Sequence, residues 1–335
     1  MQVSSSFDGG KILGAVLHSV KGFEFSSFEI GVCCPDAKKK ADARTKLIDS
    51  VCATLGKTHL RDGFDLYILV DLQTGIAQAT PQSVYVEGRY NKLSRALAQT
   101  FHYCFKCKGR GNGCPLCNGT GKLSENSVQE TLEKYFLSLF GAKGSKFHGC
   151  GREDVDVRML GSGRPFVLEL AEPKKRSVDL LSLEKKINSE IPGEVAVNGL
   201  SYCKKGRVSQ LKADEFSKIY SAKCACETEI SEAEIKKLHG LKLEISQRTP
   251  QRVEKRRADR QRAKTAHITK AQKGGENEFT IEILASHGLY IKELVSGDEG
   301  RTEPSISSLL GKKCVCKELD VLEIIMPRHD MPASL

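Results

Sequence analysis

The chain has 335 residues, of which 39% are apolar and 28% charged, and its formal net charge is +10. This length supports one large domain or two moderate ones, each with its own core. The positive charge favours an anionic partner such as nucleic acid. No run reaches the ~18 apolar residues needed to span a bilayer, and the N-terminus does not resemble a signal peptide. We therefore expect a cytoplasmic protein without a membrane partner, whose thirteen cysteines are metal ligands or core residues rather than disulfides.

The first hundred residues have the pattern of a compact α/β module. An extended stretch around residues 23–33 precedes Pro35-Asp36, where a helical pattern begins. Leu47, Val51 and Leu55 recur at a spacing of four and form one apolar face. Residues 65–71 and 83–87 have the β-rich or alternating composition of strands.

A segment rich in glycine and cysteine follows, over residues 104–121, and a helix is expected after it. Ser127 and Glu130 have the spacing of a capping box, and Gly141 can end this helix. We predict a domain boundary here, which gives an N-terminal domain over residues 1–123 and a second domain over residues 124–335.

The second domain mixes strands and helices. Helices do not separate every strand, so the sequence favours an α+β fold with a mixed, largely antiparallel sheet over a doubly wound parallel one. The expected strands are 166–170, 194–197, 241–245, 279–285 and 315–325, and the expected helix is 178–187.

Two CxxC pairs lie ten residues apart, and each continues into the same Gly-x-Gly pattern. Four thiolates at this spacing match the tetrahedral coordination of a structural Zn²⁺, with no open position for catalysis. The alternative is a flexible glycine loop with free thiols. A zinc-dependent deaminase is excluded because no histidine is followed by Glu two residues later. The same Cys-Gly repeat occurs in the zinc module of DnaJ-type chaperones, but the similarity is limited to the knuckle, the tight turn that each CxxC pair forms. The predicted ligands are Cys104, Cys107, Cys114 and Cys117.

Four further cysteines stand in two pairs with one-residue spacing, Cys224 with Cys226 and Cys314 with Cys316. In a strand, this spacing places both thiols on one face, so we expect them to pack in the core rather than bind metal.

The densest positive run extends from Arg248 to Lys264 and contains only two acids. It is either a solvated helix face or a phosphate-binding segment. Because so few acids are available for pairing, we favour nucleic-acid contact through Arg252, Arg256, Arg257 and Arg260.

The segment Gly151-Arg152-Glu153-Asp154 continues to Arg158. From the residues alone it is either a surface salt-bridge network or a carboxylate that nearby arginines keep ionised. It resembles the Gly-Arg-x-Asp motif of pseudouridine synthases, and the longer stretch is similar to the archaeal and eukaryotic tRNA pseudouridine synthases that carry an N-terminal THUMP-containing domain. Lys218-Ile-Tyr220-Ser-Ala222, the segment Gly288–Arg301 and the basic run resemble further motifs of that family, in the same order.

The resemblance implies that Asp154 is the nucleophile, with Asp156 as its competitor. It implies that Lys292 supplies the opposing charge, that Tyr220 stacks on the flipped uracil and assists removal of the C5 proton, and that Tyr290 and Arg152 contact the substrate. It further implies uridines 54 and 55 in the T arm of tRNA as substrates, an N-terminal domain that binds the acceptor stem, zinc in a structural role, and no organic cofactor or obligate protein partner. The alternatives are a catalytically silent tRNA-binding or RNA-chaperone protein of the same architecture and a zinc-ribbon adaptor.

Overall fold

The computed structural model describes residues 9–325, apart from the side chains of Lys255 and Arg256. Two compact units are present. The first contains the chain up to Val86 with Leu132–Phe147 and Leu168–Leu183, and the second contains Glu87–Thr131, His148–Val167 and the chain from Glu184 onward. The predicted boundary between residues 123 and 124 lies within the second unit, so the assignment of separate RNA-binding and catalytic domains stays a prediction. In the described part of the chain, no helix is both long and apolar enough to cross a bilayer.

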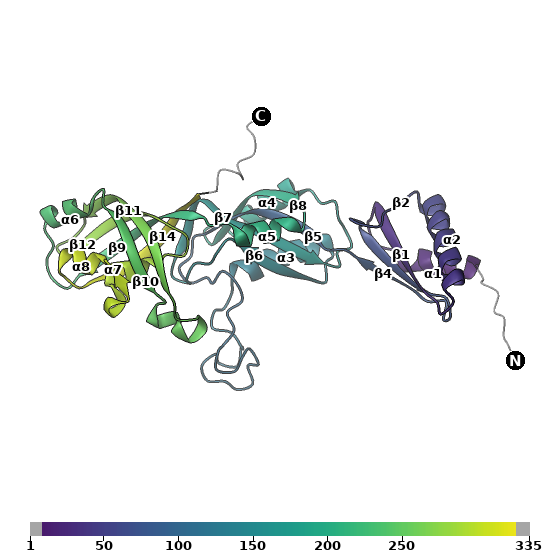
Figure 1. Ribbon diagram of the computed structural model, residues 1–335, viewed down its shortest axis with the longest axis horizontal. Coiled ribbons are helices and arrows are strands. Elements are labelled where there is room, and N and C mark those ends of the chain that lie inside the picture. Colours follow the sequence, from purple (N-terminus) through teal and green to yellow (C-terminus); the bar gives the residue numbers. More distant parts are fainter. Residues whose placement is uncertain (1–8, 326–335) are drawn as a thin grey trace, which may run out of the picture. The chain divides into compact units, whose positions relative to one another are not determined.

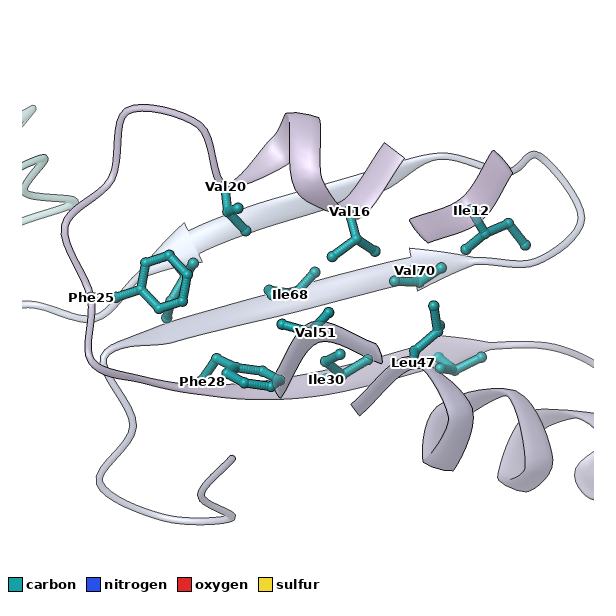
Figure 2. Packing of buried hydrophobic residues seen from close by; sticks show 12 residues of the cluster. Ile12, Val16, Val20, Phe25, Phe28, Ile30, Leu47, Val51, Ile68 and Val70 are labelled. Atoms are coloured by element: carbon teal, nitrogen blue, oxygen red, sulfur yellow. The ribbon is translucent and has the colours of Figure 1, made fainter. Parts of the chain in front are cut away.

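The first unit contains a four-stranded sheet with the order β2-β1-β3-β4. Strand β1 is parallel to β2 and β3, whereas β4 is antiparallel to β3. Helices α1 and α2 pack on the sheet, and the side chains between the helices and the sheet form the core (Figures 1 and 2). The bounds are α1 (Gly9–Ser19), β1 (Ser27–Cys33), α2 (Ala37–Leu55), β2 (Thr58–His59), β3 (Leu66–Asp71) and β4 (Ala77–Pro81).

Sequence periodicity explains this core. Leu66, Ile68 and Val70 alternate along β3 and are fully buried, while Leu69 between them is exposed. Helix α2 begins where predicted, because the Asp36 carboxylate accepts hydrogen bonds from the backbone N–H groups of Lys38 and Lys39 at 3.0 Å. Helix α1 was not predicted.

The chain then runs through β5 (Val84–Lys92), the cysteine segment, α3 (Val128–Phe140), β6 (Gly144–Gly149) and β7 (Arg158–Ala171). Helix α3 confirms the predicted helix, since the Ser127 hydroxyl accepts a hydrogen bond from the Glu130 N–H at 3.1 Å and Gly141 ends it with φ 59°. Figure 1 shows the cysteine segment as a long irregular loop between β5 and α3.

The second unit is built on a mixed, largely antiparallel sheet, as predicted. Its strand order is β13-β10-β11-β12-β9-β14-β7-β5-β8. The pairs from β13 to β14 are antiparallel, whereas β14 and β7 are parallel. The remaining strands are β8 (Val195–Cys203), β9 (Ser217–Cys226), β10 (Lys242–Arg248), β11 (Gln261–Lys273), β12 (Glu278–Ala285), β13 (Thr302–Glu303) and β14 (Cys314–Ile325).

Short helices connect these strands. They are α4 (Leu180–Glu190), α5 (Gly206–Ala213), α6 (Glu232–Leu238), α7 (Ile291–Ser296) and α8 (Ile306–Leu310), with 3₁₀ turns η1 (Gln251–Arg256) and η2 (Asp298–Gly300). The fold is therefore mixed α+β.

The two CxC pairs lie opposite each other on neighbouring strands. Cys226 is in register with Cys314, and Cys224 with Cys316, in the antiparallel pair of β9 and β14. Three of these four side chains are buried, and Cys316 is half-buried. Their placement in the sheet confirms the prediction that they are packing residues of strands.

Candidate active site

The aspartate segment forms the loop between β6 and β7. It turns at Gly151, whose φ is 71°. Glycine is favoured here by the backbone conformation, and a Cβ atom would also lie close to Arg164 Nη1, at 3.3 Å, and to Lys218 Nζ, at 3.4 Å. The loop then carries Asp154 and Asp156 towards a pocket in the second unit.

A buried ion pair between Glu153 of the loop and Arg164 of β7 anchors the loop. Arg164 Nε lies 2.7 Å from Glu153 Oε2 in this ion pair, and each side chain is only 1% exposed. The Tyr90 hydroxyl donates to Glu153 at 2.8 Å, and the Gln99 amide donates to the Tyr90 oxygen and to the Gly151 carbonyl. Burial and the Glu153 charge raise the pKa of Tyr90 well above its ordinary value, which keeps this phenol a hydrogen-bond donor.

A fully buried lysine holds the loop from the β5 side. Lys92 donates to the carbonyls of Val155 at 2.6 Å, Leu97 at 2.8 Å and Asp154 at 3.4 Å. Burial lowers the pKa of Lys92 to about 8, against the opposing effect of Glu153 and Asp156. The ammonium group of Lys92 thus binds the backbone carbonyls of Asp154 and of the next residue, Val155, which fixes the backbone of the loop at the Asp154 side chain.

The sequence did not single out Glu153 or Lys92. In the sequence, Glu153 is one acid of a charged loop, and Lys92 is one polar residue at the end of a strand. Arg164 was considered only as one of several arginines near the aspartates. No charge pattern distinguishes a buried pair from a surface one, so only the three-dimensional structure identifies these supports.

The Asp154 side chain is 44% exposed and meets two cations through a single oxygen. Its Oδ2 atom lies 2.9 Å from Arg252 Nη1 and 3.8 Å from Lys292 Nζ. Lys292 instead donates to both oxygens of Asp156, at 2.7 and 2.9 Å. The nearest opposing charge for Asp154 is therefore Arg252, which was predicted as an RNA-binding residue, and Lys292 lies between the two acids.

Asp156 is the more tightly held acid. Burial acts to raise its pKa, but the hydrogen bond and charge of Lys292 outweigh burial and leave the pKa below its ordinary value. Its backbone carbonyl also accepts a hydrogen bond from Arg95 at 2.9 Å. Arg95 in turn donates to Asp320, which ties the end of the loop to β14.

Arg252 is fixed by a third acid. Its Nε lies 2.6 Å from Glu293 Oε1, and Glu293 is almost fully buried on α7. The guanidinium carbon of Arg252 lies 5.8 Å from the centre of the Tyr290 ring, within the range of a cation–π contact. Both backbone groups of Tyr290 bond the side-chain amide of the buried Gln247, at 2.8 and 3.0 Å. Neither Glu293 nor Gln247 was predicted from the sequence.

Tyr220 lies on β9, in the centre of the sheet. Burial raises its pKa to about 12, since the charges of Glu153 and Asp154 reinforce burial and Arg164 only partly opposes it. Its phenol is thus neutral near pH 7. The ring provides an apolar face and a hydroxyl donor, but not a ready phenolate base.

Several of these side chains line one pocket of about 330 Å³. The volume is at the small end of ligand pockets, which begin near ~300 Å³. The pocket brings together the predicted residues Arg152, Asp154, Tyr220, Tyr290 and Lys292 from three segments. Arg252 and Arg257 of the basic segment and His102 also line it.

The basic segment adopts η1 and an extended continuation into β11. Arg257 and Arg260 are exposed, whereas the side chain of Arg256 lies outside the described residues. Asp259 pairs with Arg248 and Arg301. Asp259 of the segment itself, together with Asp154 and Glu293 from elsewhere in the chain, therefore pairs with part of its charge, while Arg257 and Arg260 are exposed.

The four predicted cysteines of the insert gather at one point. All four sulfur atoms lie within 4.8 Å of one another, with 3.8 Å between Cys104 and Cys114 and 3.7 Å between Cys107 and Cys117. A metal with four thiolate ligands at about 2.3 Å requires sulfur–sulfur distances of about 3.8 Å. The backbone N–H groups of Gly111 and Gly121 point at Cys107 and Cys117. The donor set thus fits a metal ion.

The glycines of the insert allow the two knuckles to pack together. A Cβ at Gly111 would lie 2.3 Å from the Gly119 carbonyl oxygen, and a Cβ at Gly121 would lie 2.4 Å from that of Gly109. This reciprocal contact explains the repeated Gly-x-Gly pattern, because each knuckle needs a residue without a side chain against the backbone of the other.

Comparison with known proteins gives consistent matches. The family model described as "Pus10, C-terminal" matches residues 85–325. A relative named tRNA pseudouridine synthase Pus10, from Korarchaeum cryptofilum, is 36% identical over 337 residues, which cover 95% of this chain and 90% of the relative. A relative of the same name from Methanocaldococcus jannaschii is 39% identical, with 94% of this chain and 72% of the relative covered.

A third relative of that name, from Archaeoglobus fulgidus, is 44% identical over 78% of this chain and 72% of its own. Among solved structures, a chain of a Cbf5-Nop10-Gar1 complex is 14% identical with a TM-score of 0.33, covering 71% of this chain and 58% of that one. This structural likeness is too partial to bear on function.

Proposed function

The chain belongs to the Pus10 family, and we propose that it isomerises uridine to pseudouridine in tRNA with the Asp154 carboxylate as nucleophile. The observation that carries this assignment is the pocket that contains Asp154, two cations and two tyrosine rings. A surface salt-bridge network would not need aromatic walls or a buried support beneath its acid.

The reaction breaks the N1–C1′ bond, turns the uracil and forms the C5–C1′ bond, with loss of the C5 proton and protonation of N1. No atoms are added overall, so neither a cofactor nor an energy source is required. A carboxylate nucleophile must be ionised and must reach a base that has left its stack. Arg252 and Lys292 place positive charge 2.9 and 3.8 Å from Asp154 Oδ2, beside the reacting carboxylate.

The aromatic residues bind the base in this scheme. Tyr220 and Tyr290 supply ring faces on which a flipped uracil can stack. Because the pKa of Tyr220 is raised to about 12, its hydroxyl acts as a hydrogen-bond donor to the uracil or to a proton-accepting group. We assign Tyr220 to stacking and orientation, and it assists removal of the C5 proton only as a neutral phenol.

We further propose that the target uridines lie in the T arm, at positions 54 and 55, and that the protein acts in the cytoplasm. Residues 1–123 would form a THUMP-like RNA-binding domain for the acceptor stem, and residues 124–335 the pseudouridine synthase domain. The four-cysteine cluster would hold a structural Zn²⁺, which the sulfur distances support. The exposed Arg257 and Arg260 would contact phosphates, with Arg256 beside them in sequence.

Tritium release tests the chemistry. A tRNA transcript labelled at uridine C5 should release tritium with the wild-type protein, and the Asp154→Asn variant should release none while binding tRNA normally. Transcripts with a cytidine at position 54 or 55 identify the modified position. Wild-type protein that binds tRNA but releases no tritium would instead support the catalytically silent alternative.

A further inference from the structure

The cysteine module, residues 103–122, exposes an aromatic and apolar surface on the outside of its two knuckles. Phe105 is 74% exposed, Tyr103 65% and Leu116 45%, while the cysteines beneath are largely buried. Such exposure has no folding benefit, because apolar surface is stabilising only when it leaves water. Exposed aromatic rings on a small rigid element are instead typical of surfaces that bind a partner.

The same surface is strongly basic. Lys106, Lys108 and Arg110 are exposed on the first knuckle, and residues 101–124 contain no aspartate or glutamate. A metal centre with four thiolate ligands is itself negative, but the exterior of the module still carries exposed cations beside the exposed ring of Phe105. Basic side chains interleaved with aromatic rings fit a single-stranded nucleic acid, whose phosphates meet the cations and whose bases stack.

The module is continuous with the pocket wall. His102 lines the pocket, and its carbonyl accepts a hydrogen bond from the Leu123 N–H at 2.8 Å. The Cys104 N–H donates to the Gly121 carbonyl at 2.8 Å, which closes the neck of the module. The chain therefore enters the module from the pocket lining at His102 and leaves it at Leu123, which is hydrogen-bonded to His102.

We propose that the cysteine module is a tRNA-docking surface, in which Phe105 stacks on an unpaired base near the target uridine and Lys106, Lys108 and Arg110 contact the adjoining phosphates. The identification of tRNA as the ligand of this surface rests on the proposed function. The proposal assigns the module a direct binding role in addition to the metal-held scaffold. The basic charge favours RNA over a protein partner.

The experiment measures tRNA affinity and single-turnover pseudouridine formation with the full chain. Phe105→Ala should weaken tRNA binding about tenfold, within the range for loss of one base stack. The rate at saturating tRNA should stay at the wild-type value, and Phe105→Trp should bind like wild type. Metal content and thermal stability should not change, because Phe105 makes little contact with the core.

Tyr202→Ala is the matched control, since it removes a 45% exposed ring from β8. It should leave affinity unchanged. Wild-type affinity in Phe105→Ala overturns the proposal and favours a protein partner for this surface, and an equal loss in Tyr202→Ala also overturns it. If the wild type forms no pseudouridine yet Phe105→Ala still weakens tRNA binding, the proposed function fails and the docking surface stands.

Discussion

The buried ion pair between Glu153 and Arg164 offers the sharpest test of how the loop is held. Glu153→Gln preserves shape but leaves the Arg164 guanidinium, in a side chain that is 1% exposed, without its counter-charge. Breaking a buried pair by removing one partner costs about 3–5 kcal/mol. We expect the free energy of unfolding to fall by about that amount, with a further loss of activity because the loop carries Asp154.

The assay is urea unfolding followed by circular dichroism, with tritium release measured under conditions where the variant is folded. The double variant Glu153→Leu with Arg164→Met should recover much of the stability, because an apolar pair of similar volume removes both buried charges. It should not recover activity if the polar network orients the loop. A loss of stability below about 1 kcal/mol in Glu153→Gln would refute the reasoning, since a solvated pair costs only about that much.

Three further predictions concern the cations and the glycines. Arg252→Ala should lower the rate at saturating tRNA by at least about tenfold, because Arg252 is the nearest cation to Asp154, and Arg252→Lys should be intermediate since an ammonium lacks the planar fork. The pKa of Lys92 is lowered to about 8, below the ordinary ~10.4 of a lysine in an unfolded chain. The contribution of Lys92 to the free energy of unfolding is therefore present above pH 10 and is lost as the pH falls through 8. The stability of wild type relative to Lys92→Met, from urea midpoints, should therefore increase between pH 7.5 and 9.5, and a constant difference contradicts this. Gly121→Ala should lose bound metal, because its Cβ would meet a carbonyl oxygen at 2.4 Å, whereas Gly119→Ala has a similar positive φ but open space and should retain the metal.

Local patterns predicted many elements of this fold. The capping residues Asp36 and Ser127, the β-rich composition of β3 and the alternation in β5 were sufficient to place helices and strands, because these signals depend only on neighbours in sequence. Helix α1 was missed although Ile12, Val16 and Val20 recur at a spacing of four and are buried. That signal was available.

The site itself could be predicted only in part. Tyr220 and Lys292 are far from Asp154 in sequence, and family resemblance rather than any physical rule indicated that they share a pocket. The partners of the cations were not predictable, because pairing depends on which strands are adjacent in the sheet. Arg252 was placed in an RNA-binding stretch, yet its guanidinium lies between Asp154 and Glu293.

The geometry adds a physical reason to choose Asp154 over Asp156 as the nucleophile. Both oxygens of Asp156 accept hydrogen bonds from Lys292, so neither is available without breaking that pair. Asp154 is held less closely, since its Oδ2 atom lies 2.9 Å from Arg252 Nη1 and 3.8 Å from Lys292 Nζ and its side chain is 44% exposed. Asp154 lines the pocket together with Tyr220 and Tyr290, where a base would lie, whereas Asp156 is outside that lining.

This arrangement gives Asp156 a positioning role that can be tested. Asp156→Asn removes the charge that holds Lys292 and frees the ammonium to move closer to Asp154, now 3.8 Å away. We expect reduced but measurable tritium release, whereas Asp154→Asn should release none. The pH profile separates a positioning role from a structural one, because a closer Lys292 should move the acidic limb of the Asp156→Asn profile to lower pH. Complete loss of release in folded Asp156→Asn, with activity retained in Asp154→Asn, would exchange the two assignments.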